Sequence, residues 1–250
     1  MRTVVVGASS GLGRCIGIWL AQRGASVALM ARRVDMLEQA AKEAGEGTVA
    51  ITCDVTDVDS CRTALDAAAE HLGGIDSVVY APAIGPLSRI EELDADTWRR
   101  AFDTNVIGAS LLTSAALPHL VETAGRAVYL SSVSASQTAP WPGLSAYAVS
   151  KAALDKLVEA WRVEHPQVGF TRLVVGDCIG GEGDAQTQFA NDWDIDLAAE
   201  MGVLWVERGL IAGCFVEVDD LVTAVDSVLR TGPSVAMSSV VVAPRPQVAP

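Results

Sequence analysis

Short apolar runs alternate with longer amphipathic stretches along most of the chain. Short β-branched and apolar runs are typical of buried strands, whereas apolar positions three and four residues apart are typical of helices. The first pattern predicts strands at 3–7, 26–31, 48–54, 75–81, 127–132, 169–175 and 238–243. The second predicts helices at 16–24, 34–45, 57–72, 94–117, 145–164 and 218–230.

Strands that alternate with helices indicate a parallel sheet covered on both faces, the doubly wound α/β architecture of the Rossmann fold. Because no repeat or low-complexity linker interrupts the alternation, we expect one domain over residues 1–250. The helix at 94–117 is expected to break near Pro118, since proline lacks the N–H that a helix interior uses. A glycine-rich stretch begins at 176, and the region of about 180–215 is predicted to be an irregular substrate lid.

Composition narrows the classes of partner. The net charge is -13 at pH 7, which argues against a nucleic acid partner, because phosphate backbones are bound by clustered Lys and Arg. The five cysteines are scattered and form no metal-ligand pattern, so we expect reduced thiols, no metal site and a cytoplasmic protein. A signal-peptide pattern and a run of about 18 apolar residues are both missing from the sequence, so no membrane partner is expected.

The sequence GASSGLG, residues 7–13, lies between the first predicted strand and helix. Backbone N–H groups and the positive end of a helix can bind a phosphate there, and glycine permits a tight turn with close backbone approach. This favours a dinucleotide cofactor held by Gly7, Ser9, Ser10, Gly11, Leu12 and Gly13. A structural turn without a ligand is the alternative.

The second strand ends in Ala31, Arg32 and Arg33. An acidic residue about 20 positions after the glycine turn binds the ribose 2′-hydroxyl of NAD, whereas an arginine there accommodates the 2′-phosphate of NADP. Because no carboxylate stands here, Arg32, supported by Arg33, favours NADP(H), while NAD(H) remains an option. Ordinary solvated surface arginines are the alternative interpretation.

SAYAVSK, residues 145–151, places Tyr147 four residues before Lys151 in a chain with three tyrosines and three lysines. Residues at i and i+4 share a helix face. A nearby positive charge favours the phenolate, so the pair would act as an acid/base near neutral pH. A chance YxxxK on a surface helix is the alternative.

Taken in order, GASSGLG, NVIG from 105, YLSS at 129–132 and YAVSK from 147 resemble the short-chain dehydrogenase/reductase family over roughly residues 3–175. The resemblance implies that Tyr147 exchanges a proton with the substrate oxygen. It implies that Lys151 holds the nicotinamide ribose and lowers the tyrosine pKa, and that Asn105 anchors a relay water. It also implies a serine that hydrogen-bonds the substrate oxygen: Ser132 fits by its place at the strand end, and Ser134 by its spacing to the tyrosine.

The same resemblance implies cofactor contacts by Asp54, Val55, Ala81 and Ile179. Asp54 would alternatively cap the helix that follows it. The chain departs from the family pattern at 80–83 and 176–179, which affects the seating of the cofactor. The family also commonly forms homodimers or homotetramers, here through the helices at 94–117 and 145–164, where Ala148, Ala152 and Ala153 are small enough for close contact.

The implied activity is the interconversion of a carbonyl compound and a secondary alcohol. Aromatic and apolar residues of the lid would suit an apolar or ring-containing small molecule as substrate. These residues are Phe189, Trp193, Met201, Trp205 and Phe215, with Trp141 from the other side. The alternative is that they only pack the lid. Two other classes remain open. A non-catalytic NADP(H)-binding sensor would keep the glycine turn, and a Rossmann-like methyltransferase would ordinarily carry an acidic residue where Arg32 stands.

Overall fold

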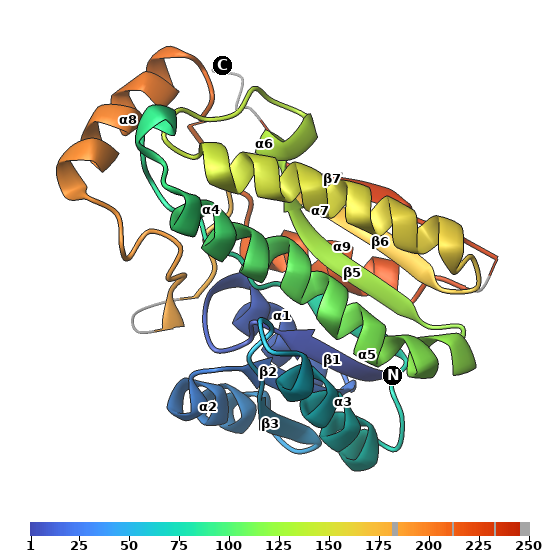
Figure 1. Cartoon of the computed structure of the whole chain (residues 1–250). Helices are drawn as coiled ribbons and strands as arrows, with labels where there is room; N and C mark the ends of the chain where they lie inside the picture. The colour runs from blue at the N-terminus through green and yellow to red at the C-terminus, as the bar shows by residue number, and fades with distance from the viewer. Residues whose placement is uncertain (182–184, 212, 233, 246–250) are drawn as a thin grey trace.

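The computed structural model describes residues 1–181, 185–211, 213–232 and 234–245. Within these residues, seven strands form one sheet in the order β3-β2-β1-β4-β5-β6-β7 (Figure 1). The strands are β1 (Arg2–Val6), β2 (Ser26–Ala31), β3 (Thr48–Thr52), β4 (Ser77–Tyr80), β5 (Arg126–Ser132), β6 (Gly169–Val175) and β7 (Ser239–Val242). All neighbouring strands are parallel, so their carboxyl ends share one edge of the sheet.

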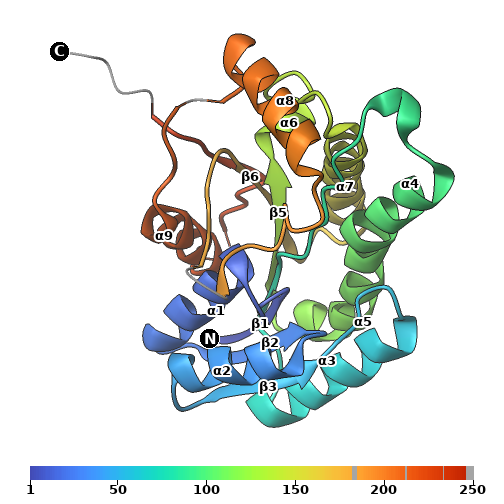
Figure 2. The ribbon, with the colours of Figure 1, turned by 90° about the vertical axis from the view of Figure 1, so that its left-hand side faces the viewer.

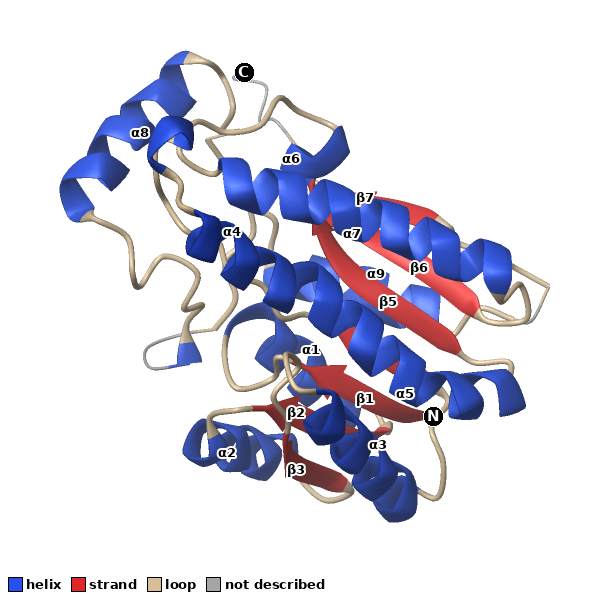
Figure 3. Ribbon diagram, viewed as in Figure 1, coloured by secondary structure: helices blue, strands red, loops and turns tan. Residues whose placement is uncertain are grey.

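Helices cover both faces of this sheet (Figure 3). The buried side chains of α1 (Gly11–Gln22), α2 (Val34–Ala44) and α9 (Val218–Leu229) pack on one face. Those of α3 (Val58–Leu72), α5 (Gly108–Glu122) and α7 (Ser145–Glu164) pack on the other. The doubly wound fold predicted from the sequence is therefore confirmed.

The strand order reverses between β1 and β4, because the chain runs outward from β1 to β3 and then returns to the other side of β1. In doubly wound sheets a ligand binds outside the carboxyl edge at such a reversal. Beyond this edge lie α6 (Val133–Ser136) and α8 (Ile195–Glu207), as Figure 2 shows. The reversal and these helices define where the site must be.

Two local predictions are wrong. The helix does not break near Pro118, which lies inside α5; the buried side chains of Leu112, Ala116 and Leu120 hold the helix on the sheet despite the missing N–H. The lid region is not irregular throughout, since it contains α8, whose N-terminus is capped by Asp194. Residues 182–184 and 212 of the lid lie outside the described residues.

A continuous helical run, Ala95–Glu122, joins α4 (Ala95–Phe102), the π-helical segment η2 (Asp103–Ile107) and α5. By length and composition alone this run is apolar enough to cross a membrane, which the sequence analysis did not expect. Its buried side chains pack into the core shared with α3 and α7. The core helix of a doubly wound fold accounts for the same composition.

Candidate active site

Glycines shape the turn that follows β1. Gly7 and Gly11 have φ of +79° and +58°, a region that favours glycine. A Cβ at position 13 would lie 2.5 Å from the carbonyl oxygen of Gly7, so Gly13 permits the close approach of helix and strand. Helix α1 begins after Ser10, whose side chain caps no amide. The first amides of α1 are therefore suited to receive a phosphate.

The chain after β6 lies against the same turn. A Cβ at Gly180 would come within 2.6 Å of the Leu12 amide nitrogen, and a Cβ at Gly11 within 3.3 Å of the Thr187 Cα. The Thr187 amide donates a hydrogen bond to the Gly180 carbonyl at 3.0 Å, while neighbouring Ile179 is 46% exposed. The segment after β6 therefore packs directly against the glycine turn.

Arg33 closes the side of the turn nearest β2. Its guanidinium donates hydrogen bonds to the Ser9 hydroxyl at 2.9 and 3.2 Å and to the Ser10 hydroxyl at 2.6 Å. Burial is the larger cause that lowers the pKa of Arg33. The positive charge of Arg32 nearby is the smaller one. The structure thus gathers two guanidiniums and two hydroxyls beside the turn, a set that fits a phosphate.

Asp54 and Val55 follow β3 at the same edge. The Asp54 carboxylate accepts hydrogen bonds from the amide and hydroxyl of Thr56 at 3.0 and 2.8 Å. These bonds and, to a smaller extent, the charge of Arg32 lower the pKa of Asp54. The alternative role of Asp54 as a helix cap is wrong, because Asp57 caps α3.

Tyr147, Lys151 and Ser132 come together where β5 meets α7. Ser132 is the last residue of β5, and its hydroxyl lies near enough to the phenol of Tyr147 to favour the phenolate and lower the pKa of Tyr147. The Lys151 ammonium lies 5.7 Å from the centroid of the Tyr147 ring and donates to the Leu130 carbonyl at 2.6 Å. The Ser134 hydroxyl lies 2.9 Å from that of Ser132, so both candidate serines sit at this site.

Burial dominates the ionisation of the pair. It raises the pKa of Tyr147 to about 12, and the Ser132 hydroxyl acts in the opposite direction. It lowers the pKa of Lys151 to about 8, and the charge of Asp155 opposes this shift. The family resemblance implies a lowered tyrosine pKa, whereas in the free protein burial raises the pKa of Tyr147. Tyr147 is a neutral phenol at neutral pH.

Asn105 fastens three parts of the site together. It lies buried in η2, and its Oδ1 accepts from the Ile84 amide at 2.9 Å. Its Nδ2 donates to the Ile84 carbonyl at 2.9 Å and to the Ser150 hydroxyl at 2.8 Å. The loop after β4, whose sequence departs from the family pattern, is thereby held next to α7. A π-helical turn within a helix is frequent at functional sites.

Aromatic rings cover Tyr147. The ring of Phe189 packs edge-on against that of Tyr147, with 4.9 Å between centroids, and Trp193 packs against Phe189 at 5.6 Å. The Trp193 indole donates to the Gly85 carbonyl at 2.7 Å. The described part of the lid therefore rests directly on the residue that the sequence predicts to be catalytic.

An apolar cluster continues from these rings. Trp205 lies 6.0 Å from Trp193 and 5.3 Å from Trp141, and it is buried together with Met201. The predicted lining is therefore assembled apart from Phe215, which is 59% exposed and lies outside the cluster. Phe215 lies eight residues after the end of α8, and the apolar pattern of the sequence alone does not show that its side chain is exposed.

Comparisons with known proteins agree with this geometry. A sequence profile described as short chain dehydrogenase matches residues 2–179. The chain belongs to the short-chain dehydrogenase family. The resemblance stated from the four motifs is confirmed.

Curated relatives of this short-chain dehydrogenase include plant proteins. An 11-beta-hydroxysteroid dehydrogenase 1A of Arabidopsis thaliana is 38% identical over 196 residues, which are 72% of this chain and 56% of that protein. An 11-beta-hydroxysteroid dehydrogenase A of Sesamum indicum is 35% identical over 179 residues, 69% of this chain and 51% of that protein. The chain thus spans about half the length of the curated relatives it matches.

Solved structures of the family show the same fold. A short-chain type dehydrogenase/reductase from Mycobacterium marinum has a TM-score of 0.81 at 27% identity, covering 97% of this chain and 93% of that one. An alcohol dehydrogenase from Thermococcus sibiricus, complexed with 5-hydroxy-NADP, has a TM-score of 0.78 at 25% identity, covering 96% and 94%.

The structure brings together many of the residues named from the sequence. Ala81, for which the resemblance implies a cofactor contact, lies beside the glycine turn, since its Cβ is 3.1 Å from where a Cβ at Gly13 would stand. The sequence analysis did not name Asp155, whose charge acts on the pKa of Lys151. Its position four residues after Lys151 could have indicated this interaction. In the described ranges, no cluster of three or more His, Cys, Asp or Glu is arranged to hold a metal.

Proposed function

We propose that this short-chain dehydrogenase is an NADP(H)-dependent oxidoreductase that interconverts a carbonyl and a secondary alcohol on a small apolar substrate. The observation that carries the proposal is the Lys151 ammonium, which lies 5.7 Å from the centroid of the Tyr147 ring and is held by the Leu130 carbonyl, two residues before Ser132 at the end of β5. A proton donor, a second hydroxyl and a cation converge there on one small volume.

The roles of the residues follow from this arrangement. A bound nicotinamide dinucleotide supplies or accepts the hydride. In the reducing direction, Tyr147 donates its phenolic proton to the substrate oxygen as the carbonyl carbon becomes a secondary alcohol. Ser132 hydrogen-bonds that oxygen, and Lys151 binds the ribose and stabilises the phenolate that remains. Asn105 holds the loop after β4 in place and anchors the relay water through which a proton returns to Tyr147.

The glycine turn and its arginines support a phosphorylated dinucleotide. The turn presents the uncapped amides of α1, and Arg33 with Ser9 and Ser10 offers charge and hydroxyl donors where a 2′-phosphate would lie. The apolar rings over Tyr147 support an apolar substrate body. The relatives named as 11-beta-hydroxysteroid dehydrogenases are consistent with a ring-containing substrate.

Titration with NADPH, NADH and S-adenosylmethionine, followed by turnover across ketones, aldehydes and secondary alcohols, tests the proposal. We expect NADPH to bind more tightly than NADH and at least one apolar ketone to be reduced. Tight NADPH binding without turnover of any compound would favour the sensor instead. Binding of S-adenosylmethionine in place of both nicotinamide cofactors would favour the methyltransferase.

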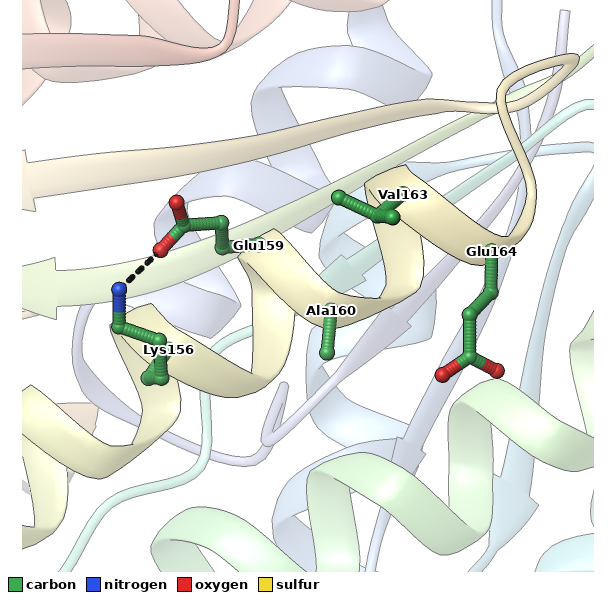
Figure 4. Close-up of a pocket in the computed structure, with 5 residues that line it drawn as sticks. All are labelled: Lys156, Glu159, Ala160, Val163 and Glu164. Atoms are coloured by element: carbon green, nitrogen blue, oxygen red, sulfur yellow. Dashed lines mark hydrogen bonds and ion pairs between the residues drawn. The ribbon is translucent and has the colours of Figure 1, made fainter.

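We further propose that the protein is a homodimer or homotetramer that pairs through α7 and the α4–α5 run. The outward face of α7 carries exposed Val149, Ala152, Ala160 and Val163, of which Ala160 and Val163 line the hollow drawn in Figure 4. Ala148 is buried against the chain's own core, so its predicted contact with a partner is wrong. Light scattering at micromolar concentration should give at least twice the chain mass of 26.1 kDa; a monomeric mass would contradict the pairing.

A further inference from the structure

A carboxylate lies one helical turn beyond Lys151 on the buried face of α7. Asp155 is 6% exposed. Its Oδ2 lies 3.5 Å from Nη1 of Arg172, at the long end of hydrogen-bond range. Its Oδ1 is buried with no hydrogen-bond partner in the part of the chain that the structure describes. A buried carboxylate used so little as an acceptor is costly, so an opposite charge nearby must offset it.

Arg172 pairs with one oxygen of Asp155, and the ammonium of Lys151, four residues earlier on α7, is a second cation on which the charge of Asp155 acts. Residues four apart share a helix face, and Lys151 is 2% exposed. Its ammonium has three donors, and the hydrogen bond found among the described residues goes to the Leu130 carbonyl. Burial lowers the pKa of Lys151, and the carboxylate of Asp155 opposes the shift. The lysine therefore depends on a nearby anion to remain charged.

The other elements packed against α7 add a cation and several neutral groups. Side chains alternate along β5, so Ser131 faces α7 as Tyr129 does, and its hydroxyl is buried without a partner among the described residues. The charged or titratable groups are Tyr147 and Asp155 from α7 and Arg172 from β6, and the neutral ones are Leu130, Ser131 and Ser132 from β5 and Asn105 from η2. Within the described residues, Asp155 is the anion of this set.

We propose that Asp155 is a positioning residue for Lys151, whose buried side chain it holds as an ammonium beside Tyr147. The proposal rests on the proposed function, because a charged Lys151 matters only if it binds the ribose and stabilises the Tyr147 phenolate. In the simplest alternative, Asp155 only fastens α7 to β6 through Arg172. The two explanations differ in what happens to Lys151 when the carboxylate loses its charge.

The lysine content makes a direct measurement possible. The chain has three lysines, Lys42, Lys151 and Lys156, so ¹³C labelling at the lysine ε carbon gives three signals to assign. Lys42 and Lys156 are exposed and serve as internal references for the fold. The signal of Lys151 in the free protein should titrate near pH 8.

Asp155→Asn keeps the size of the side chain and removes its charge. We expect the pKa of Lys151 to fall by about 1 unit or more, the shift produced by losing an opposite charge nearby. Asp155→Glu should restore most of the wild-type value. Glu159→Gln is the matched control, because it neutralises an exposed carboxylate on the same helix that pairs with Lys156 (Figure 4). It should leave the Lys151 signal unchanged.

An unchanged pKa of Lys151 in folded Asp155→Asn would overturn the proposal and leave the fastening role. Should that variant fail to fold, the wild type decides: its Lys151 signal should show a second, smaller step at acid pH when Asp155 takes up a proton, and the absence of this step contradicts the proposal. The pKa of Lys151 is measured in the protein without cofactor or substrate. Failure to turn over any carbonyl compound would therefore refute the proposed function, while the shift in the pKa of Lys151 would still be observed.

Discussion

Tyr147→Phe should reduce turnover by about 10²- to 10⁴-fold, the range typical of losing a general acid/base. The substitution removes one oxygen and keeps the ring that packs 4.9 Å from Phe189, so the lid contact and the fold should survive. The reason for the loss is specific: the phenol of Tyr147, beside the Lys151 ammonium, is the proton donor of the proposed reaction. NADPH affinity should remain close to that of the wild type.

The measurement is kcat and KM on a confirmed substrate, with NADPH binding determined separately. Tyr129→Phe is the matched control, because it removes a buried phenol oxygen that bonds Thr113 at 2.7 Å in the core below the site. It should lower stability and leave turnover per folded molecule largely unchanged. Near-normal turnover in Tyr147→Phe would mean that the YxxxK spacing is a coincidence.

Ser132→Ala and Ser134→Ala separate the two candidate serines. The Ser132 hydroxyl acts on the pKa of Tyr147, whereas Ser134 donates its backbone amide to the Ser132 hydroxyl at 3.2 Å and shares a hydrogen bond with it. We therefore expect the larger fall in turnover from Ser132→Ala. A larger fall from Ser134→Ala would reverse the assignment and favour the spacing over the strand end.

The pH dependence of the reaction should reflect the raised tyrosine pKa. In the free protein burial raises the pKa of Tyr147 to about 12, so the protonated form needed for reduction predominates at neutral pH. Oxidation of an alcohol needs the phenolate, so the oxidative rate should rise with pH, which a pH profile of alcohol oxidation would test.

The sheet and the glycine turn were predictable because local patterns determine them. Each buried strand is a short apolar run, and the turn requires glycine at Gly7 and Gly11 by positive φ and at Gly13 by close backbone approach. These constraints act within a few residues of the chain. The sequence therefore shows them without knowledge of the packing.

Other features depend on contacts between distant segments. Pro118 reads as a helix breaker, yet α5 continues because its buried face is held by the sheet. Helix α8 lies in a stretch that begins with many glycines, and its burial comes from tertiary contacts of Met201 and Trp205. The pKa of Tyr147 depends on burial beneath the lid, which the i and i+4 spacing cannot report.

Cofactor choice is the second large effect. The sequence emphasised Arg32, but the guanidinium that bonds Ser9 and Ser10 belongs to Arg33. A charge-assisted hydrogen bond is worth about 1.5–3 kcal/mol, and charge reversal adds repulsion of a 2′-phosphate. Arg33→Glu should therefore weaken NADPH binding by on the order of 10²-fold or more, and Arg32→Glu by less.

NADH affinity identifies the cause, because NADH lacks the 2′-phosphate. It should change little in either variant, and a carboxylate beside the ribose would even offer an acceptor to its 2′-hydroxyl. Arg23→Glu is the matched control: it changes the net charge equally at the far end of α1, where Arg23 stacks on Trp19, and should leave both affinities unchanged. Equal losses of NADPH and NADH in Arg33→Glu would mean that Arg33 shapes the turn through Ser9 and Ser10 and does not select the phosphate.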